Sequence, residues 1–269
     1  MKKQLFLVWM VVVALGLLAI GNTRATAYII NGDVSDWGIN LSLATSRGYL
    51  DTNLPSGGLD IDYTTEDNAD TNSEWTEVGP LWSYYNLFDA EAMYFDNDHY
   101  YAYIAIIQGL PKGGETGPGN PWFLPGDIAI DADSKLNTGE YGYEYGLDIS
   151  NSHLYANPDW KQVYYPAGSE ANPWEINENN PGTDKGEVLF AYSDNQNSHY
   201  VLEAAIPLSD LGLDADSVHN LRIHWAQECG NDYLNLNADI NHAPEPATML
   251  LLGSGLIGLG WFGRRKARR

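Results

Sequence analysis

Acidic side chains gather in a short stretch near the middle of the chain. Asp131 and Asp133 stand two residues apart, and Glu140 and Glu144 follow them. Carboxylate and carbonyl oxygens on loops are the ligands that calcium prefers. The EF-hand pattern fails here, because the sixth position is not Gly and the twelfth is not Glu. We therefore expect a calcium site of another kind, with Asp131, Asp133 and Glu140 as ligands. The alternative is a set of solvated loop acids.

Tryptophans in polar loops form a second group with possible chemistry. Sugar rings pack their C–H faces on exposed indoles, while nearby carboxylates and amides accept hydrogen bonds from hydroxyls. Trp122, Trp160 and Trp174 each lie beside a Pro or an Asp. These three are the expected glycan-binding residues. The alternative for each is an anchor that pins its loop to the protein core.

The residues that could support catalysis form no recognisable arrangement. A glycosidase needs two carboxyl groups that flank one bond, and among 36 acidic residues the sequence nominates no pair. His224 and Cys229 are close in sequence, but no oxyanion or orienting motif accompanies them. Haem binding is not expected, because Met93 is the only Met between the two ends of the chain. No nucleotide-binding motif is present either, so we expect a protein that is not an enzyme.

The charge of the chain limits its partners. Residues 28–246 contain all 36 acidic residues but only six of the 14 basic ones, so their net charge is −30. Such a surface repels nucleic acid and anionic membranes, and we expect neither as a partner of this part of the chain. It suits divalent cations and neutral polymers such as glycans. Plain solvation of a secreted surface explains the same charge without any partner.

The elements that would position these residues are strands. Alternating or continuous apolar runs of strand length predict strands at 100–107, 127–131, 141–149, 187–192, 200–206 and 221–227. In the third of these, Tyr141, Tyr143, Tyr145 and Leu147 are expected to share one face. The connections are rich in Gly, Pro, Asn and Asp. Residues 28–243 are therefore predicted to form one all-β domain, a jelly-roll-like β-sandwich with long polar loops.

Both ends of the chain carry export features. Two Lys, an apolar run and the site Ala25-Thr26-Ala27 predict a secretory signal peptide over residues 1–27. At the other end, residues 247–263 are uncharged and long enough for a short membrane span. A basic cluster from Arg264 to Arg269 follows, and it is expected to stay cytoplasmic while the acidic domain lies outside.

Residues 244–269 resemble the PEP-CTERM sorting signal. Pro244, Glu245 and Pro246 precede the apolar segment, and Arg264 and Arg265 open the basic end. The resemblance implies a bacterial protein that is recognised by an exosortase, and a cut near Pro-Glu-Pro. It also implies a cell that makes extracellular polysaccharide. The expected location is therefore the cell surface, with the chain held transiently in the inner membrane by its C-terminal helix.

Three further stretches resemble family 9 carbohydrate-binding modules and DOMON-like β-sandwiches. They are Asn31–Trp37 ("NGDVSDW"), Phe95–Asp98 ("FDND") and Glu203–Leu211 ("EAAIPLSDL"). Together with the sorting signal they favour a surface or exopolysaccharide-matrix protein that binds carbohydrate. Signal peptidase, exosortase and polysaccharide are then the expected partners. The alternatives are a non-binding acidic structural matrix protein and, third, a polysaccharide-processing enzyme.

Overall fold

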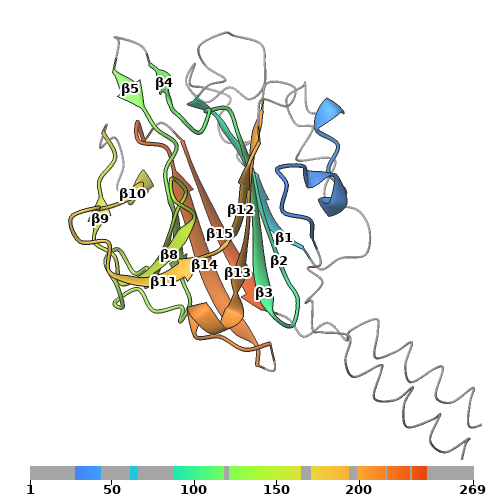
Figure 1. Cartoon of the computed structure of the whole chain (residues 1–269), viewed down its shortest axis with the longest axis vertical. Helices are drawn as coiled ribbons and strands as arrows, with labels where there is room; N and C mark the ends of the chain where they lie inside the picture. The colour runs from blue at the N-terminus through green and yellow to red at the C-terminus, as the bar shows by residue number, and fades with distance from the viewer. Residues whose placement is uncertain are drawn as a thin grey trace, which may run out of the picture.

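Two β-sheets face each other in the computed structural model (Figure 1). The model describes residues 28–43, 61–65, 88–117, 121–164, 171–193, 199–215, 217–230 and 232–240. The predicted signal peptide, residues 1–27, and the predicted sorting signal, residues 244–269, lie outside these ranges. Within them, the only helical elements are short 3-10 turns, so the predicted all-β class is confirmed.

The first sheet has five antiparallel strands in the order β1-β2-β3-β13-β12. Their bounds are Asp62–Thr65, Ala90–Asn97, Tyr101–Gln108, Tyr200–Pro207 and Leu189–Tyr192. The central pair, β3 and β13, is joined along its whole length although the two strands are about a hundred residues apart in sequence. Both strands alternate residues that face the second sheet with residues that face away from it.

The second sheet has six antiparallel strands in the order β11-β8-β7-β6-β14-β15. Their bounds are Thr183–Glu187, His153–Ala156, Tyr145–Asp148, Ile128–Asp131, His219–Ala226 and Tyr233–Ile240. In the pair β14 and β15, Ala226 lies opposite Tyr233 and His219 lies opposite Ile240. The strand β15 therefore runs from one end of the sandwich to the other.

The main core fills the space between the two sheets. Leu221, Ile223 and Trp225 alternate along β14 and point into it, as the sequence pattern predicts. From the five-stranded sheet, Ile104 and Ile106 of β3 meet them. The arrangement is a β-sandwich, and its jelly-roll connectivity stays a prediction.

Two small hairpins extend the sandwich. The strands β4 (Glu115–Thr116) and β5 (Trp122–Phe123) pair at one end, and β9 (Trp160–Lys161) and β10 (Glu175–Ile176) pair beside the six-stranded sheet. The second hairpin packs closely on the outer face of that sheet at Gly146. A Cβ atom there would come within 2.8 Å of the Trp160 ring, so only glycine allows this approach.

The N-terminal segment covers the outer face of the five-stranded sheet. It contains two 3-10 turns, η1 (Val34–Trp37) and η2 (Leu41–Leu43). Tyr28, Val34 and Trp37 pack on outward-facing residues of β2, β3 and β13. Both faces of its central strands β2, β3 and β13 are therefore buried, one under the six-stranded sheet and the other under the N-terminal segment.

One sequence prediction about a strand is wrong in detail. The strand expected at 141–149 forms only over Tyr145–Asp148, because Tyr141 and Gly142 have positive φ angles of 57° and 79° and make a turn. Tyr143 consequently joins a cluster on the outer face of the six-stranded sheet, whereas Leu147 lies in the main core. The two residues do not share a face.

The membrane-spanning helix expected over residues 247–263 lies outside the described residues. Among the described residues, no helix is long and apolar enough to cross a membrane.

Candidate functional site

The most exposed tryptophan of the described chain stands on the β4–β5 hairpin. Trp122 is 56% exposed, and its cross-strand neighbour is Thr116. Its indole lies across Gly114, where a Cβ atom would come within 2.6 Å of the indole Nε1. Gly114 has a φ angle of +81°, which side chains other than glycine rarely adopt. The hairpin is therefore shaped to hold this ring on its surface.

The other two tryptophans predicted to bind glycan are buried, so that prediction is wrong for them. Trp160 is 6% exposed and packs with Ala129, Tyr143 and Ile176. Trp174 is 5% exposed. Both residues belong to the loop region that folds back on the outer face of the six-stranded sheet, where their indoles supply the apolar contact area. They act as anchors, the alternative that the sequence left open.

A second exposed aromatic residue, Tyr164, was missed by sequence analysis. It is 59% exposed, and its ring packs edge-on against Phe123 with ring centroids 5.6 Å apart. Phe123 follows Trp122 directly and is buried against Phe88 and Cys229. The only signal for Tyr164 in the sequence is its place at the start of a polar loop, two residues before Pro166.

Hydrogen bonds tie this end of the molecule together. The Leu124 backbone N–H donates to the Glu228 carboxylate at 3.0 Å, and the Glu228 N–H donates to the Leu124 carbonyl at 3.1 Å. The Tyr164 N–H donates to the Glu228 carbonyl at 2.7 Å. We call the β4–β5 hairpin together with Tyr164 the hairpin end. It presents two exposed aromatic rings on a backbone that is fixed to the six-stranded sheet.

The predicted calcium ligands are only partly brought together. Oxygen atoms of Asp131, Asp133 and Glu144 lie within 4.8 Å of one another. Glu140 is not in this group, because its carboxylate accepts a hydrogen bond from the Trp160 backbone N–H at 2.7 Å. Glu144 takes its place. Three carboxylates at this spacing offer the oxygen ligands that a hard cation needs.

The charges around these three carboxylates are unequal. Asp131 is buried and accepts a hydrogen bond from Arg222 Nε at 2.8 Å, and Asp133 pairs with Lys135 at 2.9 Å. The Glu144 carboxylate accepts the Ala132 N–H at 3.0 Å. Burial, and then the charges of Asp131 and Asp133, raise the pKa of Glu144. A cation bound beside Glu144 would therefore reduce the repulsion among the three carboxylates.

His224 and Cys229, the other candidates for chemistry, make separate contacts. The His224 ring lies 2.7 Å from the Asn235 side-chain oxygen and 2.9 Å from the Pro173 carbonyl. Burial lowers its pKa. The Cys229 thiol is buried and donates to the Gln227 side-chain oxygen at 3.7 Å. These contacts fit a role in packing.

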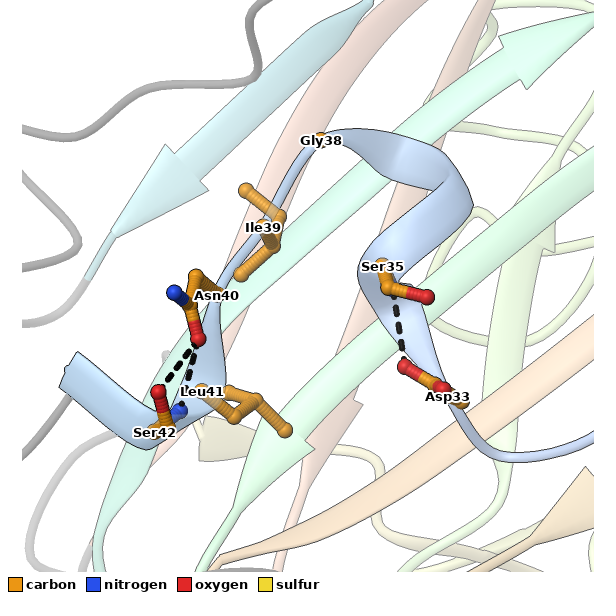
Figure 2. A pocket seen from close by; sticks show the side chains of 7 residues that line it. All are labelled: Asp33, Ser35, Gly38, Ile39, Asn40, Leu41 and Ser42. Atoms are coloured by element: carbon orange, nitrogen blue, oxygen red, sulfur yellow. Dashed lines mark hydrogen bonds between the residues drawn. The ribbon is translucent and has the colours of Figure 1, made fainter.

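A surface pocket of about 400 Å³ lies beside the N-terminal 3-10 turns (Figure 2). Its polar side chains are already used by the backbone around them. Asp33 accepts the Ser35 N–H at 2.9 Å, and Asn40 accepts the Ser42 N–H at 3.1 Å. These bonds cap the local turns, so the pocket offers few free polar groups to a ligand.

Comparison with known proteins identifies one segment. Residues 242–266 match the model of the PEP-CTERM protein-sorting motif. No curated protein and no solved structure matches the chain. The match confirms the predicted sorting signal and contains Pro244, Glu245, Pro246, Arg264 and Arg265. It identifies an exported cell-surface protein that is processed by an exosortase. No match supports the resemblance to family 9 carbohydrate-binding modules or DOMON-like domains.

Proposed function

We propose that this exported surface protein binds polysaccharide through its hairpin end. The observation that carries the proposal is the exposure of Trp122. It is 56% exposed, whereas the other tryptophans of the described ranges, Trp37, Trp160, Trp174 and Trp225, are at most 6% exposed. Tryptophan combines a large apolar ring with a polar N–H and is enriched at binding surfaces, and this hairpin holds its ring exposed.

The surroundings of Trp122 fit a glycan better than a charged polymer. The indole face can pack on the C–H face of a sugar ring. The Tyr164 ring packs instead on Phe123, whose side chain points to the opposite face of the hairpin from Trp122. Thr116 lies directly opposite Trp122 on the paired strand, and its hydroxyl can exchange hydrogen bonds with sugar hydroxyls. The net charge of −30 on residues 28–246 favours a neutral polysaccharide over an anionic one.

The test is a binding assay with the exported protein on an array of neutral and charged polysaccharides. Truncating one central aromatic residue of a binding surface typically costs about 2 kcal/mol, so Trp122→Ala should weaken binding roughly 30-fold. Tyr100→Ala is the matched control, because Tyr100 is also exposed but precedes β3, at the far end of the sandwich. Equal binding by the two variants, or no binding by the wild type, would refute the proposal.

We also propose that calcium binds at Asp131, Asp133 and Glu144 as a structural ion. The close oxygen atoms and the raised pKa of Glu144 support it. Calcium there would hold the loop after β6 to the turn before β7. It would neutralise part of the acidic surface without taking part in a reaction.

The second candidate function is that of an acidic structural matrix protein without a ligand. The burial of Trp160 and Trp174 favours it, because these indoles serve the fold. The exposed residues along β15, Asn235, Asn237 and Asp239, add a hydrated polar row. Both candidates are non-enzymatic, and we propose that the protein catalyses no reaction. Absence of binding to every polysaccharide on the array would favour the structural role. Cleavage of a bound polysaccharide would establish the third alternative, an enzyme.

A further inference from the structure

The sandwich has one closed side and one open side. At the closed side the outer strands are β1 and β15, and the Asp239 N–H donates to the Asp62 carboxylate at 2.7 Å. At the other side the outer strands are β11 and β12, which the chain joins through the single residue Val188. Among the described residues, no strand pairs with the outer edge of either. Such an edge presents backbone N–H and C=O groups that another strand can bind.

The β11 edge carries features that protect it from pairing. Its register is irregular between Asp184 and Gly186, and Lys185 and Glu187 add exposed charges. Charges and irregularities of this kind keep other strands away. The β12 edge lacks them, because its sequence Leu-Phe-Ala-Tyr contains no charge and no Pro and its register on β13 is regular. Its first residue, Leu189, is 51% exposed. The β12 edge is therefore the unprotected one.

The backbone groups of β12 alternate in direction. The Ser193 N–H donates to the Val201 carbonyl of β13 at 2.8 Å, and the Val188 N–H donates away from β13, to a carbonyl of the β7–β8 turn, at 2.9 Å. Because the direction changes with each residue, the N–H and C=O groups of Phe190 and Tyr192 point to the open edge. The side chains of these two residues pack against the main core. The edge thus offers hydrogen bonds next to two aromatic rings.

We propose that β12 pairs with β12 of a second copy of this chain, antiparallel and about a two-fold axis at Ala191. In this register, Phe190 of each copy exchanges both backbone hydrogen bonds with Tyr192 of the other, so every outward N–H of the strand gains an acceptor. The two aromatic side chains lie side by side and extend the main core, and such cross-strand pairs stabilise sheets. A register with Phe190 opposite itself would need the Val188 N–H, which is already donated.

The charges beside the edge favour a copy of this acidic chain as the partner. Residues 28–246 have a net charge of −30 and only six basic residues, and two of these six lie at the open side. Lys112 holds its ammonium group 5.1 Å from the centre of the Phe190 ring, and Lys185 is exposed on β11. An acidic partner is attracted at this side, whereas two copies repel each other elsewhere.

Antiparallel pairing turns the two copies in opposite directions. The sorting motif of each copy starts two residues after Ile240, the last residue of β15, so the two motifs leave the pair at opposite ends. Two chains held in one membrane by these motifs cannot pair in this way. The pair therefore joins released chains, or chains on facing surfaces, and links surface molecules to one another.

The first experiment is a register-specific crosslink in the full-length chain, purified in detergent micelles. In the proposed pair the two Ala191 Cα atoms are about 4.5 Å apart, within reach of a disulfide. The two Leu189 Cα atoms are about 14 Å apart, because they lie on opposite sides of the axis, four residues apart along the strands. Under mild oxidation, Ala191→Cys should therefore form a disulfide-linked dimer at least about tenfold faster than Leu189→Cys, although Leu189 is the more exposed residue. Intact mass without reductant reads the dimer, and wild type, whose Cys229 is buried, gives the background.

The second experiment is sedimentation equilibrium in the same micelles, at about 1 to 100 µM, because a strand of four residues makes a small and weak interface. Leu189→Asp places a charge on the edge and should raise the Kd about tenfold, since the symmetric pair loses a cross-strand contact twice. Val218→Asp is the matched control. It adds the same charge at a residue that is 73% exposed just before β14, and it should dimerise like wild type.

Three results would overturn the proposal. The first is equal crosslinking of Ala191→Cys and Leu189→Cys. The second is a Kd that Leu189→Asp and Val218→Asp change equally. The third is a wild type that stays monomeric over the whole range, which would leave the edge to a strand of another protein. None of these readouts involves polysaccharide, so the test is independent of the proposed binding function.

Discussion

The variants Trp37→Phe and Trp122→Phe make the same chemical change at two positions, the first buried and the second exposed. Trp37 is fully buried, and its indole N–H donates to Glu203 at 2.9 Å. Phenylalanine cannot donate, so a buried carboxylate oxygen loses its partner, at a cost of about 1.5–3 kcal/mol. The smaller ring also leaves a cavity that costs about 1 kcal/mol. Trp37→Phe should therefore destabilise the protein by about 3 kcal/mol.

For a domain of this size, about 3 kcal/mol corresponds to a fall in Tm of roughly 6–12 °C. Trp122→Phe should change the free energy of unfolding by less than about 0.5 kcal/mol, since Trp122 lies on the surface. The effects of the two substitutions on polysaccharide binding should rank the other way. Trp122→Phe should weaken polysaccharide binding about fivefold, a cost of about 1 kcal/mol. Trp37→Phe should leave the Kd unchanged.

The assay is calorimetric unfolding of both variants, followed by polysaccharide binding in the same buffer at a temperature where both are folded. A Tm of Trp37→Phe within about 1 °C of wild type would refute the assignment of Trp37 to the fold. A large fall in Tm for Trp122→Phe would refute the view that its ring is free to bind. Loss of binding in Trp37→Phe at an unchanged Tm would place the ligand at the N-terminal segment instead.

Three further predictions concern the calcium group and the hairpin. Calcium at about 100 times its Kd should stabilise the wild type by about 2.7 kcal/mol, seen as a rise in Tm. Glu144→Gln should lose this rise and Glu140→Gln should keep it; the reverse result would restore Glu140 as a ligand. Without calcium, the raised pKa of Glu144 contributes stability below its unfolded pKa that is lost as pH rises through the folded pKa. The Tm of wild type relative to Glu144→Gln should therefore fall from pH 4 to pH 7 in chelator, and a flat difference would contradict this sign. Finally, Gly114→Ala should displace Trp122 and weaken polysaccharide binding, because its Cβ would lie 2.4 Å from the Phe123 carbonyl oxygen. Gly113→Ala, which meets no atom within 4 Å, should bind normally, and equal binding by both would contradict the argument.

Local patterns were sufficient to predict much of the sandwich. The runs behind β3, β13 and β14 are rich in β-branched and aromatic residues, so their strand character is visible without any tertiary contact. The strand β15 was missed, because Asn235, Asn237 and Asp239 make its exposed half resemble a loop. Alternation with buried Leu and Ala was the signal that could have revealed it.

The binding residues were harder to predict, because exposure depends on contacts that are distant in sequence. Trp122, Trp160 and Trp174 all stand in polar surroundings along the chain, yet two of them are covered. Trp160 packs on the sheet at Gly146, and Trp174 packs with Val163, Ala171 and Ala226. Contacts that are distant in sequence also decide which of Glu140 and Glu144 can serve as a calcium ligand. The Glu140 carboxylate accepts a hydrogen bond from the Trp160 backbone N–H in β9, while the Glu144 carboxylate lies close to those of Asp131 and Asp133. No pattern within the loop distinguishes the two.

The course of β15 also separates the hairpin end from the start of the sorting motif. At its first residue, Tyr233, the strand lies beside Ala226, near the Glu228 turn that holds the hairpin end. After eight residues, or about 24 Å, it ends at Ile240 on the opposite side (Figure 1). The sorting motif starts at residue 242. If a chain is retained through that motif, we expect Trp122 to lie at the end of the sandwich that faces away from the membrane.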